Sequence, residues 1–144
     1  MNVNDEELRQ MLALMDSYKN RVEALTRQAQ VLRSTLDEVN MADTSIKTLI
    51  DAKEGDEIMV PIGASSFMNV KVTSNKNIIV GIGSGISVEK APEEASKFME
   101  ANAAEISEAL KKTVDAVQEV QQALTTVSEA VKTEYMNRQQ EQTQ

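Results

Sequence analysis

The chain contains no cysteine and no histidine, and aromatic residues make up only 3% of it. Without cysteine, neither a disulfide framework nor a thiolate nucleophile is available. Without histidine, the chain lacks the commonest general base near neutral pH and the commonest transition-metal ligand. Carboxylates and lysines remain, but the usual catalytic groups are missing. We therefore expect no cofactor, no metal and no enzymatic activity.

The charge balance is acidic, with 23 acidic and 15 basic residues in 144 and a net charge of −8. No basic stripe is present to neutralise phosphates, which argues against a nucleic-acid partner and against an anionic membrane surface. No apolar run reaches the roughly 18 residues of a membrane span, and no charged-then-apolar leader is present. We expect a cytoplasmic protein without a membrane partner.

The N-terminal third reads as one long helix, because residues 5–53 contain neither glycine nor proline. Apolar residues recur there at alternating spacings of three and four, which is the seam of a left-handed coiled coil. Asn4 and Glu7 form a capping box, Gly55 is a C-terminal stop, and Asp43 is the only polar break. The pattern predicts a helix over 4–54 with the seam Leu8, Met11, Met15, Tyr18, Val22, Leu25, Ala29, Leu32, Leu36, Val39, Asp43, Ile46 and Ile50.

The C-terminal third repeats the pattern, with Thr113 as its only polar break. Pro92 suits a first helical turn, and Glu134 and Arg138 take the next two seam positions, so the apolar seam ends at Val131. We predict a helix over 92–137 and a frayed polar tail over 138–144. The seam is Met99, Ala103, Ile106, Leu110, Thr113, Val117, Val120, Leu124, Val127 and Val131.

The two helices match in length, at about 45 residues or roughly 70 Å each. Equal length and similar seams predict that they fold back on each other as an antiparallel coiled-coil hairpin. The intervening residues would lie at one end of this arm, and both chain termini at the other.

Residues 55–91 change to a period of two, interrupted by turn signals at 63–66, 74–77 and 83–85. The pattern predicts two β-hairpins and an α+β, mainly α, fold. So small a sheet cannot cover its own apolar face, and helices that point away as an arm leave it bare. We therefore expect several chains to pool their hairpins in one β-core through Ile58, Val60, Ile62, Met68, Val70, Val72, Ile78, Val80, Ile82, Ile86 and Val88.

Gly81, Gly83 and Gly85 raise the question of a nucleotide site. A dinucleotide fingerprint is spaced G-x-G-x-x-G and lies directly between a strand and a helix. Here the spacing is G-x-G-x-G, and the following "ISVEK" is strand-like. We interpret Gly83 and Gly85, like Gly63, as turn residues, and Gly81 as marking a bulge or a close neighbouring backbone.

The runs "EGDEIMVPIGASSFMNVKV" and "VGIGSGISVEK", set between two heptad helices, resemble the α class of archaeal prefoldin subunits over nearly the whole chain. Gly83 and Gly85 fall on that family's glycine pair. Gly81 stands at a usually acidic position, and Ile86 and Ser87 stand where the family usually has tyrosines. Two hairpins point to the α class, since the similar β class has one.

The resemblance implies a hexamer of two α and four β subunits, whose hairpins form a double β-barrel platform carrying six coiled-coil arms. It also implies an ATP-independent holdase, which captures unfolded polypeptides at the distal arm tips and passes them to a group II chaperonin.

Client contacts are then expected where both termini lie. Leu12 and Met136 are off the seam, so helix pairing does not account for them, and with Tyr135 they are expected to be accessible. Methionine is flexible and polarizable, which suits a surface for many sequences. The candidate contacts are Val3, Leu8, Met11, Leu12, Met15, Val131, Tyr135 and Met136, with Asp5, Glu6, Glu7 and Glu134 as charges for docking a chaperonin.

Two other interpretations remain open from the residues. One is a structural coiled-coil adaptor that tethers specific folded partners, and would not protect unrelated denatured proteins. The other is a nucleotide-dependent enzyme that uses the glycine segment, and would give binding heat with ATP or NAD.

Overall fold

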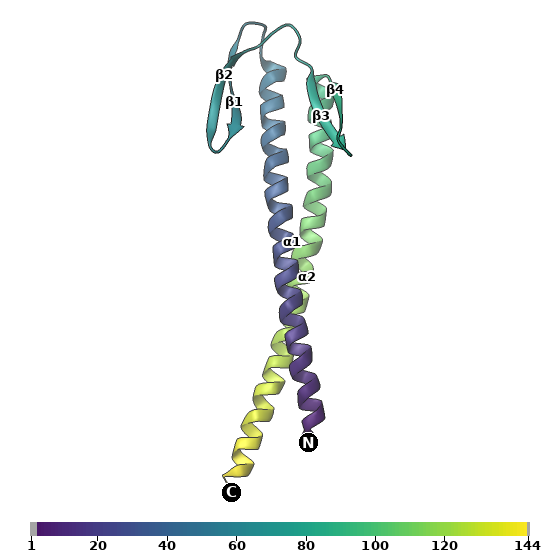
Figure 1. The fold of residues 1–144 in the computed structure, drawn as a ribbon, viewed down its shortest axis with the longest axis vertical. Coiled ribbons are helices and arrows are strands. Elements are labelled where there is room, and N and C mark those ends of the chain that lie inside the picture. Colours follow the sequence, from purple (N-terminus) through teal and green to yellow (C-terminus); the bar gives the residue numbers. More distant parts are fainter. Residues whose placement is uncertain (1–2, 144) are drawn as a thin grey trace. The chain divides into compact units, whose positions relative to one another are not determined.

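The computed structural model describes residues 3–143 (Figure 1). Two long helices enclose two β-hairpins in chain order, as the sequence predicts. The elements are α1 (Asp5–Asp51), β1 (Glu57–Gly63), β2 (Ser66–Lys71), β3 (Ile78–Gly83), β4 (Ile86–Lys90) and α2 (Pro92–Gln142). The chain divides into two units: the terminal unit, Met1–Arg33 with Glu108–Gln144, and the hairpin unit, Ser34–Ser107.

The predicted seams are confirmed in both units, since every seam position of α1 and α2 is buried or half-buried. The capping box is also formed: Glu7 N donates to Asn4 Oδ1 at 2.8 Å, and Asn4 N donates to Glu7 Oε2 at 2.9 Å. These two bonds satisfy backbone N–H groups that a helix start leaves without partners. Helix α1 therefore begins where its sequence predicts.

The C-terminal boundary differs from the prediction, because α2 continues to Gln142 and residues 138–142 are helical. Glu134 and Arg138 extend the seam as a charged pair: Glu134 is 4% exposed, and Arg138 Nε donates to its Oε1 at 2.8 Å. A guanidinium thus neutralises the carboxylate that the seam buries, so the helix does not need an apolar residue there.

The polar break in each seam has its own partner. In the hairpin unit the Ser96 hydroxyl donates to Asp43 Oδ1 at 2.6 Å, which joins α2 to α1. Lys47 Nζ lies 3.0 Å from both Asp43 and Glu100, one on each helix. In the terminal unit the buried Thr113 hydroxyl donates to the carbonyl of Ala109 in its own helix at 2.9 Å. Buried polar groups are tolerated at these positions because each is hydrogen-bonded.

Helix α1 ends against the segment that links the hairpins. The helix carries no basic residue in its last turn. Instead, Lys76 reaches back from the linker and its Nζ donates to the Ala52 carbonyl at 3.0 Å. A cation at this place satisfies an orphan carbonyl and complements the negative end of the helix dipole. The chain then turns at Gly55, whose φ is 88°.

The two hairpins follow one design. Each is an antiparallel pair with a shift in register two residues before the turn, at Ile62 between β1 and β2 and at Ile82 between β3 and β4. The next residue is a glycine at positive φ, 109° for Gly63 and 107° for Gly83. The turns then close with two positive-φ residues, which match the right-handed twist of the strands; they are Ala64 and Ser65 in the first hairpin and Ser84 and Gly85 in the second.

A small core in the hairpin unit packs β3 against both helices. It is centred on Ile46 of α1, Val80 of β3 and Ala95 of α2, which are 6%, 2% and 0% exposed. Ile50, Ile78, Phe98 and Met99 pack around it. The expectation that the helices leave the hairpins bare is therefore wrong for the first half of β3. The reason is that this hairpin lies back along the start of α2 instead of extending away from it (Figure 1).

Candidate interaction surfaces

Exposed apolar side chains gather on the hairpins. Strands cannot bury both of their faces against two helices, so the residues beyond the small core remain in water. At the bulges and beside the turns, Ile62, Ile82 and Ile86 are 61%, 49% and 56% exposed. The set is Met59, Ile62, Phe67, Met68, Ile79, Ile82 and Ile86. Each hairpin thus carries its own group of exposed apolar side chains, and such groups are typical of a surface that another protein covers.

The predicted assembly residues divide along each strand. Val72 and Val80 are buried, and Ile58, Val60, Val70, Ile78 and Val88 are half-buried. Ile62, Met68, Ile82 and Ile86, at the turn ends, are exposed. Of the predicted residues, those away from the turns thus pack within this chain, and those beside the turns are exposed.

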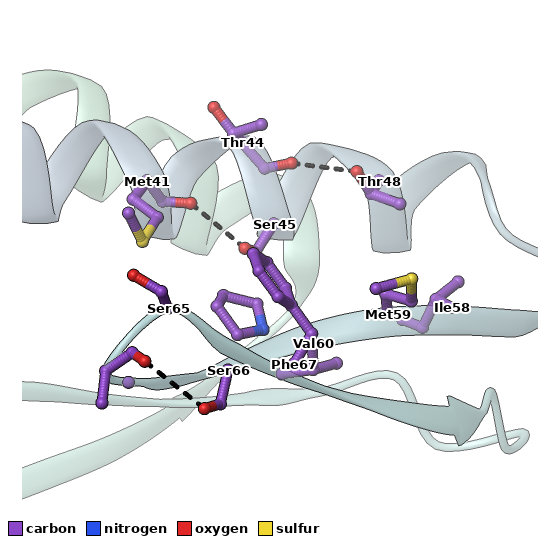
Figure 2. Close-up of a pocket in the computed structure, with 13 residues that line it drawn as sticks. Met41, Thr44, Ser45, Thr48, Ile58, Met59, Val60, Ser65, Ser66 and Phe67 are labelled. Atoms are coloured by element: carbon purple, nitrogen blue, oxygen red, sulfur yellow. Dashed lines mark hydrogen bonds between the residues drawn. The ribbon is translucent and has the colours of Figure 1, made fainter.

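A groove of about 860 Å³ separates the first hairpin from α1 (Figure 2). On the helix side the hydroxyls of Thr44, Ser45 and Thr48 donate to the carbonyls four residues earlier, at 3.0–3.1 Å. Because these hydroxyls are engaged by the backbone, their carbon atoms give the groove an apolar helix wall. On the strand side the Phe67 ring points towards Ser45, and Met41 lies across from Ser65.

The glycine segment forms a closed turn. Gly81 pairs with Ser87 and Gly83 pairs with Ile86, so the strand pairing continues up to the two turn residues. A Cβ placed on Gly81 would meet no atom of residues 3–143 within 4 Å, so no close backbone in this described part explains that glycine. The bulge lies one residue later, at Ile82. The backbone here is arranged for strand pairing and not as an open cradle.

The structure separates the predicted client contacts into buried and exposed residues. Leu8 and Val131 are 8% and 6% exposed, so their side chains join the helix ends and do not face a client in this conformation. Tyr135 and Met136 are 48% and 54% exposed. Val3, Met11, Leu12 and Met15 are half-buried.

One exposed residue near the start of α1 was missing from the sequence-based set. Leu14 is 43% exposed. Like Leu12 it lies off the seam, so the same argument from helical position would have found it. In the hairpins, the exposed residues Phe67 and Met59 were missing from the predicted assembly set. They lie on the strand face opposite to the one predicted to be apolar.

Arg138 organises the helix ends of the terminal unit. Besides Glu134, its Nη1 donates to Asp5 Oδ1 at 2.6 Å and its Nη2 to the Val3 carbonyl at 2.8 Å. Hydrogen bonding to Glu134, and then to Asp5, raises the pKa of the Arg138 guanidinium above its ordinary value. The group is therefore charged throughout the accessible pH range. Because Asp5 and Glu134 bond to Arg138 and Glu7 belongs to the capping box, Glu6 is the only one of the four predicted docking charges without such a role.

Among residues 3–143 no cluster of three or more acidic, histidine or cysteine side chains is placed to hold a metal ion. Within the same residues no helix combines the length and apolarity needed to cross a membrane.

Two long paired helices that enclose two antiparallel hairpins define a class of protein, the coiled-coil subunits with β-hairpins between their helices. Residues 18–137 match the family described as Prefoldin subunit. The chain is 34% identical over 132 residues to prefoldin subunit alpha of Pyrococcus horikoshii, covering 86% of this chain and 84% of that protein. It is also 34% identical over 108 residues to prefoldin subunit alpha of Methanothrix thermoacetophila, covering 75% and 71%.

The chain therefore belongs to the prefoldin subunit family and is of the archaeal α class. Its fold is also that of a chain in a filamentous prefoldin from Methanocaldococcus jannaschii solved by electron cryomicroscopy. That likeness has a TM-score of 0.51 at 22% identity and covers 87% of this chain and 98% of the other. Members of the family are chaperone subunits, and the resemblance seen in the sequence is confirmed.

Proposed function

We propose that this chain is a subunit of an ATP-independent holdase. It joins β-class subunits through its hairpins, captures unfolded polypeptides at its helix ends and delivers them to a group II chaperonin. The observation that carries the proposal is the exposure of Leu14, Tyr135 and Met136 in the terminal unit. These groups have no role in the helix seam, and they lie in a different unit from the exposed hairpin residues.

Energies favour weak and shared capture. Covering one exposed Leu or Met side chain contributes about 1.5–3 kcal/mol before ordering costs. Association entropy removes much of the gain from a few such contacts. A single pair of helix ends therefore holds a client briefly, and several pairs acting on one client hold it through effective concentration.

The test is a triple variant, Leu14→Gln, Tyr135→Gln and Met136→Gln, in the full chain assembled with β-class subunits. Glutamine keeps good helix propensity and removes the apolar surface. We expect unchanged assembly mass and a several-fold higher concentration to suppress aggregation of two unrelated denatured proteins. Met41→Gln is the matched control, since Met41 is 59% exposed but lies in the hairpin unit.

If the triple variant protected the denatured proteins fully, the helix ends could not be the client-binding site. Failure of the wild type to protect either denatured protein would favour the adaptor interpretation instead. Delivery is tested separately, by transfer of a labelled client from the assembly to a group II chaperonin in the absence of ATP.

A further inference from the structure

One side chain fastens the start of α1 to the end of α2. Two hydrogen bonds of Arg138 cross from α2 to the start of α1, to Asp5 and to the carbonyl of Val3. The capping box of Asn4 and Glu7 fixes the chain between those two acceptors. A rigid helix start thus presents a carboxylate and a carbonyl together to one planar guanidinium, whose forked donors suit such a pair.

The residues joined by these bonds lie just beyond the last buried apolar seam positions of both helices. Val131 and Glu134 are successive seam positions on α2, and Leu8 is the first apolar seam position described on α1. All three are less than 9% exposed. Opening the cross-helix bonds would therefore uncover Leu8 and Val131.

The cross-helix bonds are suited to release. The Asp5 side chain is 83% exposed, and an ion pair so open to water is weak and screened by salt. Glu134 keeps Arg138 as its partner through the i, i+4 contact within α2, so opening the helix ends leaves no buried carboxylate unpaired. A contact that breaks without stranding a charge can open and close repeatedly.

We propose that Arg138 is a latch that sets how often the helix ends part, and so how much apolar surface an unfolded client meets. The inference rests on the proposed function for its consequence. When the latch opens, Leu8 and Val131 join Leu14, Tyr135 and Met136 as client contacts. The two buried members of the predicted client set then have a role that the closed conformation hides.

The decisive variant is Asp5→Asn, because it weakens the cross-helix pair and leaves Glu134 and Arg138 bonded to each other. Glu6→Gln is its matched control, since it removes the same charge from the same first turn of α1 and has the same relation to the helix dipole. Amide hydrogen exchange over residues 8–12 of the full chain is the readout of opening. We expect exchange to be about two- to fivefold faster in Asp5→Asn than in Glu6→Gln, the range for an exposed ion pair.

Salt gives a second readout. Exchange of residues 8–12 in the wild type should quicken as salt is added, and the same residues in Asp5→Asn should respond much less. Arg138→Gln, which removes both cross-helix bonds, should give faster exchange than Asp5→Asn. Client capture by the Asp5→Asn assembly should require less protein than capture by the Glu6→Gln assembly.

Equal exchange in Asp5→Asn and Glu6→Gln would overturn the latch, whatever the capture assay shows. Faster exchange in Asp5→Asn without improved capture would overturn the link between opening and client binding. Failure of the proposed client site is recognised by a separate result. The triple variant at Leu14, Tyr135 and Met136 would then protect denatured proteins as fully as the wild type.

Discussion

Asp43 is a charged residue in a seam that is otherwise almost wholly apolar. Burial alone would raise the pKa of its carboxyl, but the hydrogen bonds from Ser96 and Lys47 outweigh burial and lower that pKa below its ordinary 3.8. A lowered pKa in the folded state means that the carboxylate stabilises the fold above pH 3.8. This contribution is lost as the pH falls through the lower, folded-state pKa.

Asp43→Ala should therefore lower the free energy of unfolding at pH 7 by about 1–3 kcal/mol. This is the range for losing a hydrogen bond to a charged group and leaving its partner without a bond. Urea unfolding measures the loss, and Asp37→Ala is the control because Asp37 is exposed on the same helix. The difference between the two variants should shrink when the pH is brought below 3.8. Equal losses in both variants at pH 7 would contradict this role for Asp43.

The first hairpin turn uses residues poorly suited to it. Ala64 and Ser65 have φ of 49° and 58°, a region that side chains with a Cβ disfavour. Asn-Gly is the preferred pair for a turn with two positive φ values. Ala64→Asn with Ser65→Gly should raise the free energy of unfolding by about 1 kcal/mol, measured by urea unfolding.

Gly85→Ala in the second turn is the opposite change, because it removes a glycine from a position with a positive φ of 74°. It should lower the free energy of unfolding by about 1 kcal/mol, although a Cβ there meets no atom within 4 Å. A loss in the first turn, or none in the second, would show that backbone conformation does not govern these turns.

At the scale of elements, the spacing of apolar residues along the sequence was enough to predict both helices and their seams. Each seam residue needs only a facing helix, so a local period of three and four carries the information. The end of α2 was not predictable in this way. Burial of Glu134 depends on Arg138, and the place of Arg138 depends on Asp5, which is 133 residues earlier in the chain.

The strands show the same limit. Their alternation predicted the hairpins and the face that Val72 and Val80 bury. It did not predict that Phe67 and Met59, on the opposite face, would line a groove beside α1. How a hairpin rests against a helix depends on the linkers at its ends, and the period of a strand carries no information about them.

The turn halves of the hairpins are where we expect assembly to occur. Ile82→Thr with Ile86→Thr keeps β-branched residues in both strands and removes apolar surface that is 49% and 56% exposed. The fold of the chain should be unchanged by circular dichroism. Each isoleucine buried in an interface contributes about 1.5–3 kcal/mol, so affinity for β-class subunits should fall at least tenfold.

Mass measurement of the mixed subunits across a dilution series tests this expectation. Ser87→Thr, at an exposed position of β4 next to Ile86, is the control and should assemble normally. Wild-type affinity in the double variant would place the assembly surface elsewhere, for example in the groove beside α1.

At the scale of the whole molecule, client holding should depend on the number of helix ends that act together. The isolated chain offers one set of exposed apolar groups, and an assembly offers several sets to a single client. At equal subunit concentration, the assembly should therefore suppress aggregation at least tenfold more effectively than the chain alone. Light scattering of a denatured client measures the ratio, and equal protection by the isolated chain would contradict shared capture.

The shared design of the hairpins gives the chain a modular character. The same bulge, the same positive-φ glycine and the same two-residue turn occur twice, at Ile62–Ser65 and Ile82–Gly85. The two hairpins therefore repeat one backbone conformation in two separate sheets, so a substitution in one hairpin leaves the strand pairing of the other unchanged. If assembly occurs through the hairpins, as we propose, each chain brings two such units to it. A chain that gained or lost one hairpin would therefore bring a different number of assembly contacts, while its two helices stayed the same.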